Sequence, residues 1–294
     1  MNLTPESKVL IQGISEPLSS THAARMKAYG TKVVAGVSPG QGGQTLDDIP
    51  VFDLVEQAIA VVGSVDTTII FVPPYQVLDA ALEAIAAGIR QIIIISTGMP
   101  PLDMVHLLRK AEATETLVVG PNSPGIIVPG KILLGTHALE FYIPGQIGIV
   151  SRSTTLTYEI ALELTKASLG QSISVSIGSD AIAGSSFLQW LQILDEDETT
   201  QAIVLIGEPG GNSEEAAAEY IAEAIDKPVI AYIAGRQAPA GKHWGHAGAL
   251  AQVVGRGANV GTAQSKIAAF NKVNIPIAER PSQIPGLVKK ALKK

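Results

Sequence analysis

Residues 91–119 have the sequence QIIIISTGMPPLDMVHLLRKAEATETLVV. The stretch opens with an isoleucine run, Gln91–Ser96, whose length and composition favour a buried strand over a helix. Apolar residues then recur at helical spacing over Leu102–Ala113, and a second short apolar run covers Thr116–Val119. A strand, a helix and a strand in this order predict one unit of a parallel α/β sheet.

The same alternation continues on both sides of this stretch and predicts parallel sheets with helices on both faces. In the first half we predict further strands over Lys8–Gln12, Lys32–Val37 and Thr67–Val72, and further helices over Thr21–Tyr29, Phe52–Val62 and Gln76–Ala87. In the second half the predicted strands are Gln146–Val150, Ser172–Ile177, Gln201–Ile206, Val229–Ile233 and Val273–Ile277. The predicted helices of that half are Thr155–Ala167, Ser185–Ile193, Glu214–Ile225, Gln264–Phe270 and Gln283–Lys293.

A passage rich in glycine and proline divides the chain. The sequence GPNSPG at residues 120–125 suits neither a helix nor a strand. A length of 294 residues fits two domains of roughly 150 residues each. We therefore predict an α/β domain over residues 1–125, a linker over 126–145 and a second α/β domain over 146–294.

The composition excludes several classes of protein. Hydrophobic residues make up 46% of the chain and charged residues only 16%, so we expect some apolar surface to contact another subunit. A net charge of −6 argues against nucleic-acid binding, and the absence of cysteine excludes disulfides and thiolate catalysis. No signal segment and no apolar run of roughly 18 residues is visible, which predicts a soluble cytoplasmic protein. No spacing of His, Asp and Glu suggests a metal site.

In the first half, candidate binding residues follow the predicted strands, because ligands of open α/β sheets bind beyond the carboxyl ends of the strands. The turn after the first strand retains only Gly13 of a Gly-rich phosphate loop, while Glu16 would repel a phosphate and Pro17 donates no N–H. The second strand is followed by the turn Ser38–Gly43, which could approach a nucleotide closely or be a simple turn.

The second half offers three candidate positions. Ser153 or Thr154 would cap a helix start, which could bind an anion or be a well-capped helix and nothing more. Glu208 follows a strand and could hold an imidazole nitrogen, or be a solvated turn residue. His246 lies between small residues in the sequence GKHWGHAG at 241–248, so it is either a reachable nucleophile or an incidental surface histidine.

Taken together and in order, several motifs resemble the α subunits of succinyl-CoA synthetases, within the NDP-forming acyl-CoA synthetases. The motifs are GPN at 120–122, GIVSRS at 148–153, LTYE at 156–159, IGE at 206–208, YIAG at 232–235 and GHAGA at 245–249. The resemblance runs almost end to end. It implies an N-terminal Rossmann-like CoA-binding domain and a C-terminal flavodoxin-like domain, acting with a β subunit whose ATP-grasp domain binds ATP or GTP with Mg.

The resemblance also assigns roles in the second half. It implies that His246 is phosphorylated and passes the phosphate to a carboxylic acid, and that Glu208 orients this histidine. Ser153 and Thr154 match the helix start that receives the phosphate, although Thr154 replaces a usual glycine. Tyr158 matches a residue near the substrate.

In the first half, the resemblance implies a CoA site with several departures from the family pattern. Its residues would be Gly13, Ser15, Glu16, Pro17, Leu18, Gln41, Ile95, Ser96, Thr97 and Asn122. The family's first loop is Gly-rich, whereas Ser15-Glu16-Pro17-Leu18 occupy it here. Gln41 stands in place of a lysine, Thr97 in place of a glutamate, and Ser123 in place of a cysteine.

The expected function is therefore that of the α subunit of an ATP- or GTP-dependent succinate–CoA ligase. A ligase for another dicarboxylate, such as malate, is the alternative within this class. A non-catalytic paralogue that binds a β subunit without using CoA is the alternative from another class, and the altered first loop favours it. An oxidoreductase is disfavoured because the pyrophosphate loop is missing.

Overall fold

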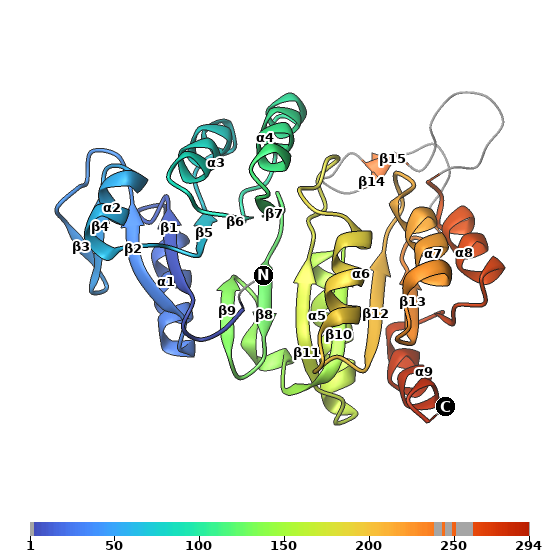
Figure 1. Cartoon of the computed structure of the whole chain (residues 1–294). Coiled ribbons are helices and arrows are strands. Elements are labelled where there is room, and N and C mark those ends of the chain that lie inside the picture. The colour runs from blue at the N-terminus through green and yellow to red at the C-terminus, as the bar shows by residue number, and fades with distance from the viewer. Residues whose placement is uncertain (1–2, 238–242, 245–248, 251–260, 294) are drawn as a thin grey trace. The chain divides into compact units, whose positions relative to one another are not determined.

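The computed structural model describes residues 3–237, 243–244, 249–250 and 261–293 (Figure 1). The chain divides into two compact units. The first contains residues 1–137 together with 182–184, and the second contains residues 138–181 and 185–294. The predicted α/β class is confirmed in each unit, since each is built on a mostly parallel sheet.

The first unit contains one seven-stranded sheet in the order β3-β4-β2-β1-β5-β6-β7. Its strands are β1 (Lys8–Gln12), β2 (Lys32–Val37), β3 (Thr45–Leu46), β4 (Ile49–Phe52), β5 (Thr67–Ile70), β6 (Gln91–Ile94) and β7 (Leu117–Val119). All neighbours are parallel except β3 and β4. All strands of this sheet except β3 therefore end at the same edge, which we call the carboxyl edge of the first sheet.

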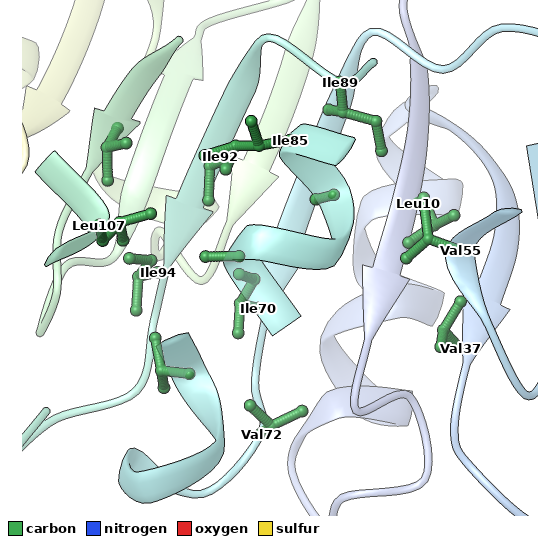
Figure 2. Packing of buried hydrophobic residues seen from close by; sticks show 14 of the residues in the cluster. Leu10, Val37, Val55, Ile70, Val72, Ile85, Ile89, Ile92, Ile94 and Leu107 are labelled. Carbon is green, nitrogen blue, oxygen red and sulfur yellow. The ribbon is translucent and has the colours of Figure 1, made fainter. Parts of the chain in front are cut away.

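Four α-helices pack on this sheet: α1 (Ser19–Tyr29), α2 (Val55–Val62), α3 (Val77–Ala86) and α4 (Pro101–Ala113), with a short η1 (Pro74–Gln76) before α3. Leu10, Ile70 and Ile94 of the strands pack with side chains of α2, α3 and α4 in one buried cluster (Figure 2). Helix α1 instead packs against β2 and against β9 of an added hairpin. These contacts account for the apolar spacing seen in the sequence.

The added hairpin consists of β8 (Gly125–Val128) and β9 (Ile132–Gly135), which are antiparallel. A methyl group at Gly125 would lie 2.0 Å from the Leu134 carbonyl oxygen, so this position accepts only glycine. Residues 126–145, expected as a linker, thus contain most of this hairpin, η2 (Leu139–Phe141) and the start of β10.

The second unit contains a sheet with the parallel order β16-β13-β12-β10-β11. Its strands are β10 (Pro144–Ser151), β11 (Gln171–Ser176), β12 (Ala202–Gly207), β13 (Val229–Ile233) and β16 (Ile277–Ala278). Its helices are α5 (Thr154–Lys166), α6 (Phe187–Glu196), α7 (Ser213–Ala224), α8 (Ala263–Lys272) and α9 (Ile284–Ala291), with η3 (Pro281–Gln283) before α9. Helices α6, α7 and α8 pack in sequence, while α5 packs with α9. A short antiparallel pair, β14 (His243–Trp244) and β15 (Ala249–Leu250), completes the described elements.

Most predicted elements differ from the observed ones by one to four residues at an end, and two of the differences have a clear physical cause. The helix expected over Phe52–Val62 begins only at Val55, because Phe52 is the end of β4 and its carbonyl accepts the Ser38 N–H at 2.9 Å. The strand expected over Val273–Ile277 is reduced to β16, because Asn274 has a positive φ of 59° and Pro276 has no N–H. Among the described residues, each helix is too short or too polar to cross a bilayer.

Candidate active site

The carboxyl edge of the second sheet brings two of the singled-out segments together. Strands β10 and β12 are parallel neighbours and end at Ser151 and Gly207. Arg152 and Glu208 therefore follow at the same edge, and the Arg152 N–H donates to the Ile206 carbonyl at 3.1 Å. Parallel pairing thus places the start of α5 beside the end of β12.

Glu208 lies against a group of buried charges from three other elements. Glu214, at the start of α7, and Lys266, on α8, are both fully buried and form an ion pair. The Glu214 Oε1 atom accepts the Glu208 backbone N–H at 3.1 Å and lies 3.6 Å from Nη1 of Arg152. We call Arg152, Glu208, Glu214, Glu215 and Lys266 the ionic cluster.

The end of β12 is glycine for a reason that the ionic cluster explains. A methyl group at Gly207 would lie 2.6 Å from Cγ of Glu214, which is closer than the side chain could tolerate. Glycine at this position lets the Glu214 carboxyl reach the backbone of the next residue.

The carboxyl of Glu208 is half-buried and titrates near neutrality. Burial raises its pKa to about 7, and the nearby Glu214 adds to this rise, while Arg152 and Lys266 act in the opposite direction. A carboxyl in this range can change protonation state under working conditions, which is typical of functional sites.

The start of α5 is arranged as the sequence suggested, with one difference. Ser153 has the extended backbone of an N-cap residue and Thr154 begins the helix, but the Ser153 hydroxyl makes no capping hydrogen bond. The Ser151 hydroxyl instead accepts the Ser153 N–H and donates to the Ser153 carbonyl, each at 2.9 Å. The first turn carries no acidic residue, so its N–H groups suit an anion.

Tyr158 lies one turn further along α5. Its ring packs against Phe141 with the centroids 5.8 Å apart. His246, the predicted nucleophile, lies outside the described residues.

In the first unit, the turn after β1 contacts the turn after β2. The hydroxyls of Ser15 and Ser38 lie 2.6 Å apart, and the Gln41 N–H donates to the Ser38 carbonyl at 3.1 Å. Gly13 has a φ of 78°, and a methyl group there would lie 2.9 Å from the Val72 backbone nitrogen. Glu16, Pro17 and Leu18 complete this turn, with Leu18 70% exposed.

The turns after β5, β6 and β7 are also joined. The Ser96 hydroxyl donates to the Val72 carbonyl at 2.6 Å, and the Asn122 N–H donates to the Ser96 carbonyl at 2.9 Å. The Ile95 N–H donates to the Ile70 carbonyl at 3.0 Å, and Thr97 is exposed. The predicted CoA residues therefore gather in two hydrogen-bonded groups of turns, both at the carboxyl edge of the first sheet.

The residues that the sequence analysis missed are Glu214, Glu215 and Lys266. Acidic residues such as Glu214 and Glu215 are common in the first turn of a helix, where they interact favourably with the helix dipole, so their position did not indicate a functional role. A signal existed for Lys266, because it shares the buried face of α8 with Ala263 and Phe270 at helical spacing. A lysine in that register requires a buried partner.

Two other features do not coincide with this site. A cavity of about 500 Å³ opens at the opposite edge of the second sheet, where Val229 and Pro276 lie, and none of the predicted site residues lines it. Within the described ranges, no three His, Asp or Glu side chains could hold a metal ion.

Two models of known protein families match separate parts of the chain. The model of the CoA binding domain family matches residues 4–98, and that of the CoA-ligase family matches residues 150–274. The succinate–CoA ligase [ADP-forming] subunit alpha 2 of Archaeoglobus fulgidus is 44% identical over 286 residues, or 97% of each chain. The corresponding alpha subunit of Aquifex aeolicus is 44% identical over 292 residues, covering 98% of this chain and 93% of the relative.

A solved structure shares the fold at lower identity. The ATP citrate lyase of Methanothrix soehngenii superposes with a TM-score of 0.88 at 22% identity, covering 100% of this chain and 50% of that one. This likeness extends the shared fold over both units.

Proposed function

The chain belongs to the family of succinate–CoA ligase α subunits, and we propose that with a β subunit in the cytoplasm it converts succinate and CoA reversibly into succinyl-CoA. The observation that carries the proposal is the place of Glu208. A half-buried carboxyl with a pKa of about 7 directly follows β12, and the first turn of α5 at the same edge carries no acidic residue. An imidazole and a phosphate need such neighbours.

In the proposed reaction His246 carries the phosphoryl group. A ring nitrogen of His246 forms an N–P bond as the bond to the nucleoside diphosphate breaks. The phosphoryl group then passes to a carboxylate oxygen of succinate, and the CoA thiolate displaces inorganic phosphate to form the thioester. Glu208 accepts a hydrogen bond from the other ring nitrogen and thereby fixes the tautomer.

The start of α5 is the proposed phosphate site. The N–H groups of a helix start, together with its dipole, stabilise an anion by about 0.3–2 kcal/mol, which positions a phosphate without trapping it. Ser153 and Thr154 lie at this start, and Tyr158 follows on the same helix, where we expect it near the carboxylic acid.

The carboxyl edge of the first sheet is the proposed CoA site. No acidic residue lies in the first turn of α1, and its N-cap residue, Leu18, makes no side-chain capping bond. Ser19 is buried, and its hydroxyl finds no partner among the described residues. These groups suit a phosphate of CoA, while Ser15, Gln41, Ser96, Thr97 and Asn122 border the same edge.

The nucleotide is assigned to the partner. The sequence contains no Gly-x-x-x-x-Gly-Lys-Ser/Thr loop of the kind that binds nucleoside triphosphates with Mg. We therefore propose that a β subunit binds ATP or GTP and that the isolated chain has no ligase turnover.

Reconstitution tests this function directly. The chain is combined with the β subunit encoded beside it, and release of ADP or GDP is measured with and without CoA and succinate. Release that requires both substrates, and that is absent for either subunit alone, is the expected result. Turnover with malate in place of succinate would reassign the substrate, and no CoA binding at millimolar concentration would favour the non-catalytic paralogue.

A further inference from the structure

The ionic cluster contains a lysine whose every donor is used. The Nζ atom of Lys266 is bonded to the Glu214 carboxylate, to Oε2 of Glu215 at 3.2 Å and to the Gly211 carbonyl at 3.1 Å. An ammonium group has three N–H donors, and these three acceptors account for all of them. The Lys266 side chain is fully buried, so its geometry is set by this cluster and not by solvent.

The turn that follows β12 is held at four backbone groups, three of them by the ionic cluster. The Glu208 N–H is bound by Glu214 at 3.1 Å, and the Gly211 carbonyl is bound by Lys266. Between them, the Gly210 carbonyl accepts from Arg152 at 3.0 Å, and the Gly210 N–H donates to the Gly261 carbonyl at 2.8 Å. The backbone position of Glu208 is therefore fixed by these neighbours.

Stability alone does not account for such a cluster. A buried ion pair gains little over apolar side chains of similar volume, because removing the charges from water offsets their attraction. The buried face of α8 that carries Lys266 also holds Ala263 and Phe270, so apolar side chains replacing both Lys266 and Glu214 would suit this face. The charge at this position needs another explanation.

We propose that Lys266 is a positioning residue for the phosphotransfer reaction: through Glu214 it fixes the turn that carries Glu208, and its positive charge favours the ionised Glu208 carboxylate. This inference rests on the proposed function of Glu208. It adds two residues, Lys266 and Glu214, that act through Glu208.

The charges around Glu208 act on its ionisation in opposite directions. Arg152 at the end of β10 and Lys266 on α8 lower the pKa of Glu208, whereas Glu214 on α7 raises it. Glu215, the remaining charged member, is bonded to Lys266 and to the Ser265 hydroxyl. Removing Lys266 or Glu214 must therefore move the Glu208 titration in opposite senses.

The test compares Lys266→Met, Glu214→Gln and the control Lys272→Met, which changes an exposed lysine at the end of the same helix. Phosphorylation of the αβ complex by labelled nucleotide is measured against pH. We expect the acid limb to move up by about one pH unit in Lys266→Met and down by a similar amount in Glu214→Gln, with no shift in Lys272→Met. Equal profiles, or shifts of the same sign, would overturn the inference.

A second readout separates this inference from the proposed function. The carboxyl of Glu208 is titrated in the full chain by ¹³C NMR and assigned by its loss in Glu208→Gln. Opposite shifts in the two variants support positioning even if the wild-type complex takes up no phosphate, a result that would count only against the proposed function. If Lys266→Met does not fold, the downward shift in Glu214→Gln decides, and an unmoved titration there contradicts the inference.

Discussion

At the scale of single residues, Glu208 connects the proposed chemistry to stability. When its carboxyl is protonated, the charges of the ionic cluster balance, because the two cations Arg152 and Lys266 are paired with the two carboxylates of Glu214 and Glu215. The ionised form, which would orient an imidazole, leaves one net negative charge there. Function and stability therefore favour opposite protonation states of one residue.

Glu208→Gln should slow phosphorylation of the αβ complex by roughly 10²-fold, because the amide cannot hold an imidazolium or fix the tautomer as a carboxylate does. Rapid-quench measurement of label incorporation gives the rate. Glu219→Gln, which changes an exposed residue of α7, is the control. A wild-type rate in Glu208→Gln would remove the orienting role.

The same substitution should stabilise the chain at high pH. The folded-state pKa of about 7 lies above the ordinary value of 4.5, so the folded chain binds more protons between these values. The free energy of unfolding contributed by Glu208 therefore falls as the pH rises from about 4.5 to about 7. Urea unfolding should show Glu208→Gln gaining about 2 kcal/mol over the wild type at pH 8 relative to pH 4.5; an equal difference at both pH values would contradict this account.

The sequence was sufficient to identify Glu208 as a candidate site residue but not to identify the charged residues around it. Glu208 directly follows an apolar strand, and strand ends are where α/β sites form, so its position was visible. Lys266 lies 58 positions further on, and only the packing of α7 on α8 brings it to Glu214. Whether Glu208 contacts His246 stays a prediction.

At the scale of elements, one buried hydroxyl joins the β8–β9 hairpin to the loop between α1 and β2. The Thr31 Oγ1 atom donates to the Leu133 carbonyl at 2.8 Å and accepts the Leu133 N–H at 3.1 Å. Thr31 lies between α1 and β2, so these bonds join the hairpin to the rest of the first unit.

Thr31→Val keeps the side-chain shape but leaves a buried N–H and a buried carbonyl without partners, so it should cost about 1–3 kcal/mol of unfolding free energy. Thr31→Ser retains the hydroxyl and is the matched control for the hydrogen bonds. Urea unfolding followed by circular dichroism gives both values. Equal stabilities of the two variants would show that these bonds do not hold the hairpin.

The turn before α1 is the element on which CoA affinity depends. Glu16 lies in the turn that leads into α1, and a carboxylate near a phosphate bound there would cost about 1 kcal/mol at partial exposure. Glu16→Gln should therefore tighten CoA binding to the αβ complex several-fold at low salt and less at high salt. Titration calorimetry measures this, with Glu112→Gln at the far end of α4 as the control; unchanged affinity at low salt would place Glu16 away from the phosphates.

Most elements could be predicted because their apolar runs are long and regular. Strands β1, β2 and β13 begin and end at the predicted residues. The short strands β3, β4, β8 and β9 could not, since two to four residues give no clear period and glycine and proline interrupt them. Their pairing depends on neighbours that are distant in sequence.

At the scale of the whole molecule, the chain forms two α/β units, and a short segment from the second half of the sequence belongs to the first unit. Residues 182–184 belong to the first unit, where the Gly184 N–H donates to the Gly120 carbonyl at 2.7 Å. A methyl group at Gly184 would lie 2.5 Å from Cγ1 of Val118, so only glycine packs there. Nothing in the local sequence indicates such a placement, whereas the repeated strand–helix alternation indicated two α/β units.

We propose that this α subunit carries a phosphoryl group on His246, and mapping the phosphorylated residue tests this proposal. The αβ complex is incubated with labelled nucleoside triphosphate, and the label is characterised in the wild type, His246→Asn and His243→Asn. We expect an acid-labile, base-stable label on the wild type and on His243→Asn, and none on His246→Asn. Label that persists in His246→Asn and disappears in His243→Asn would contradict the account.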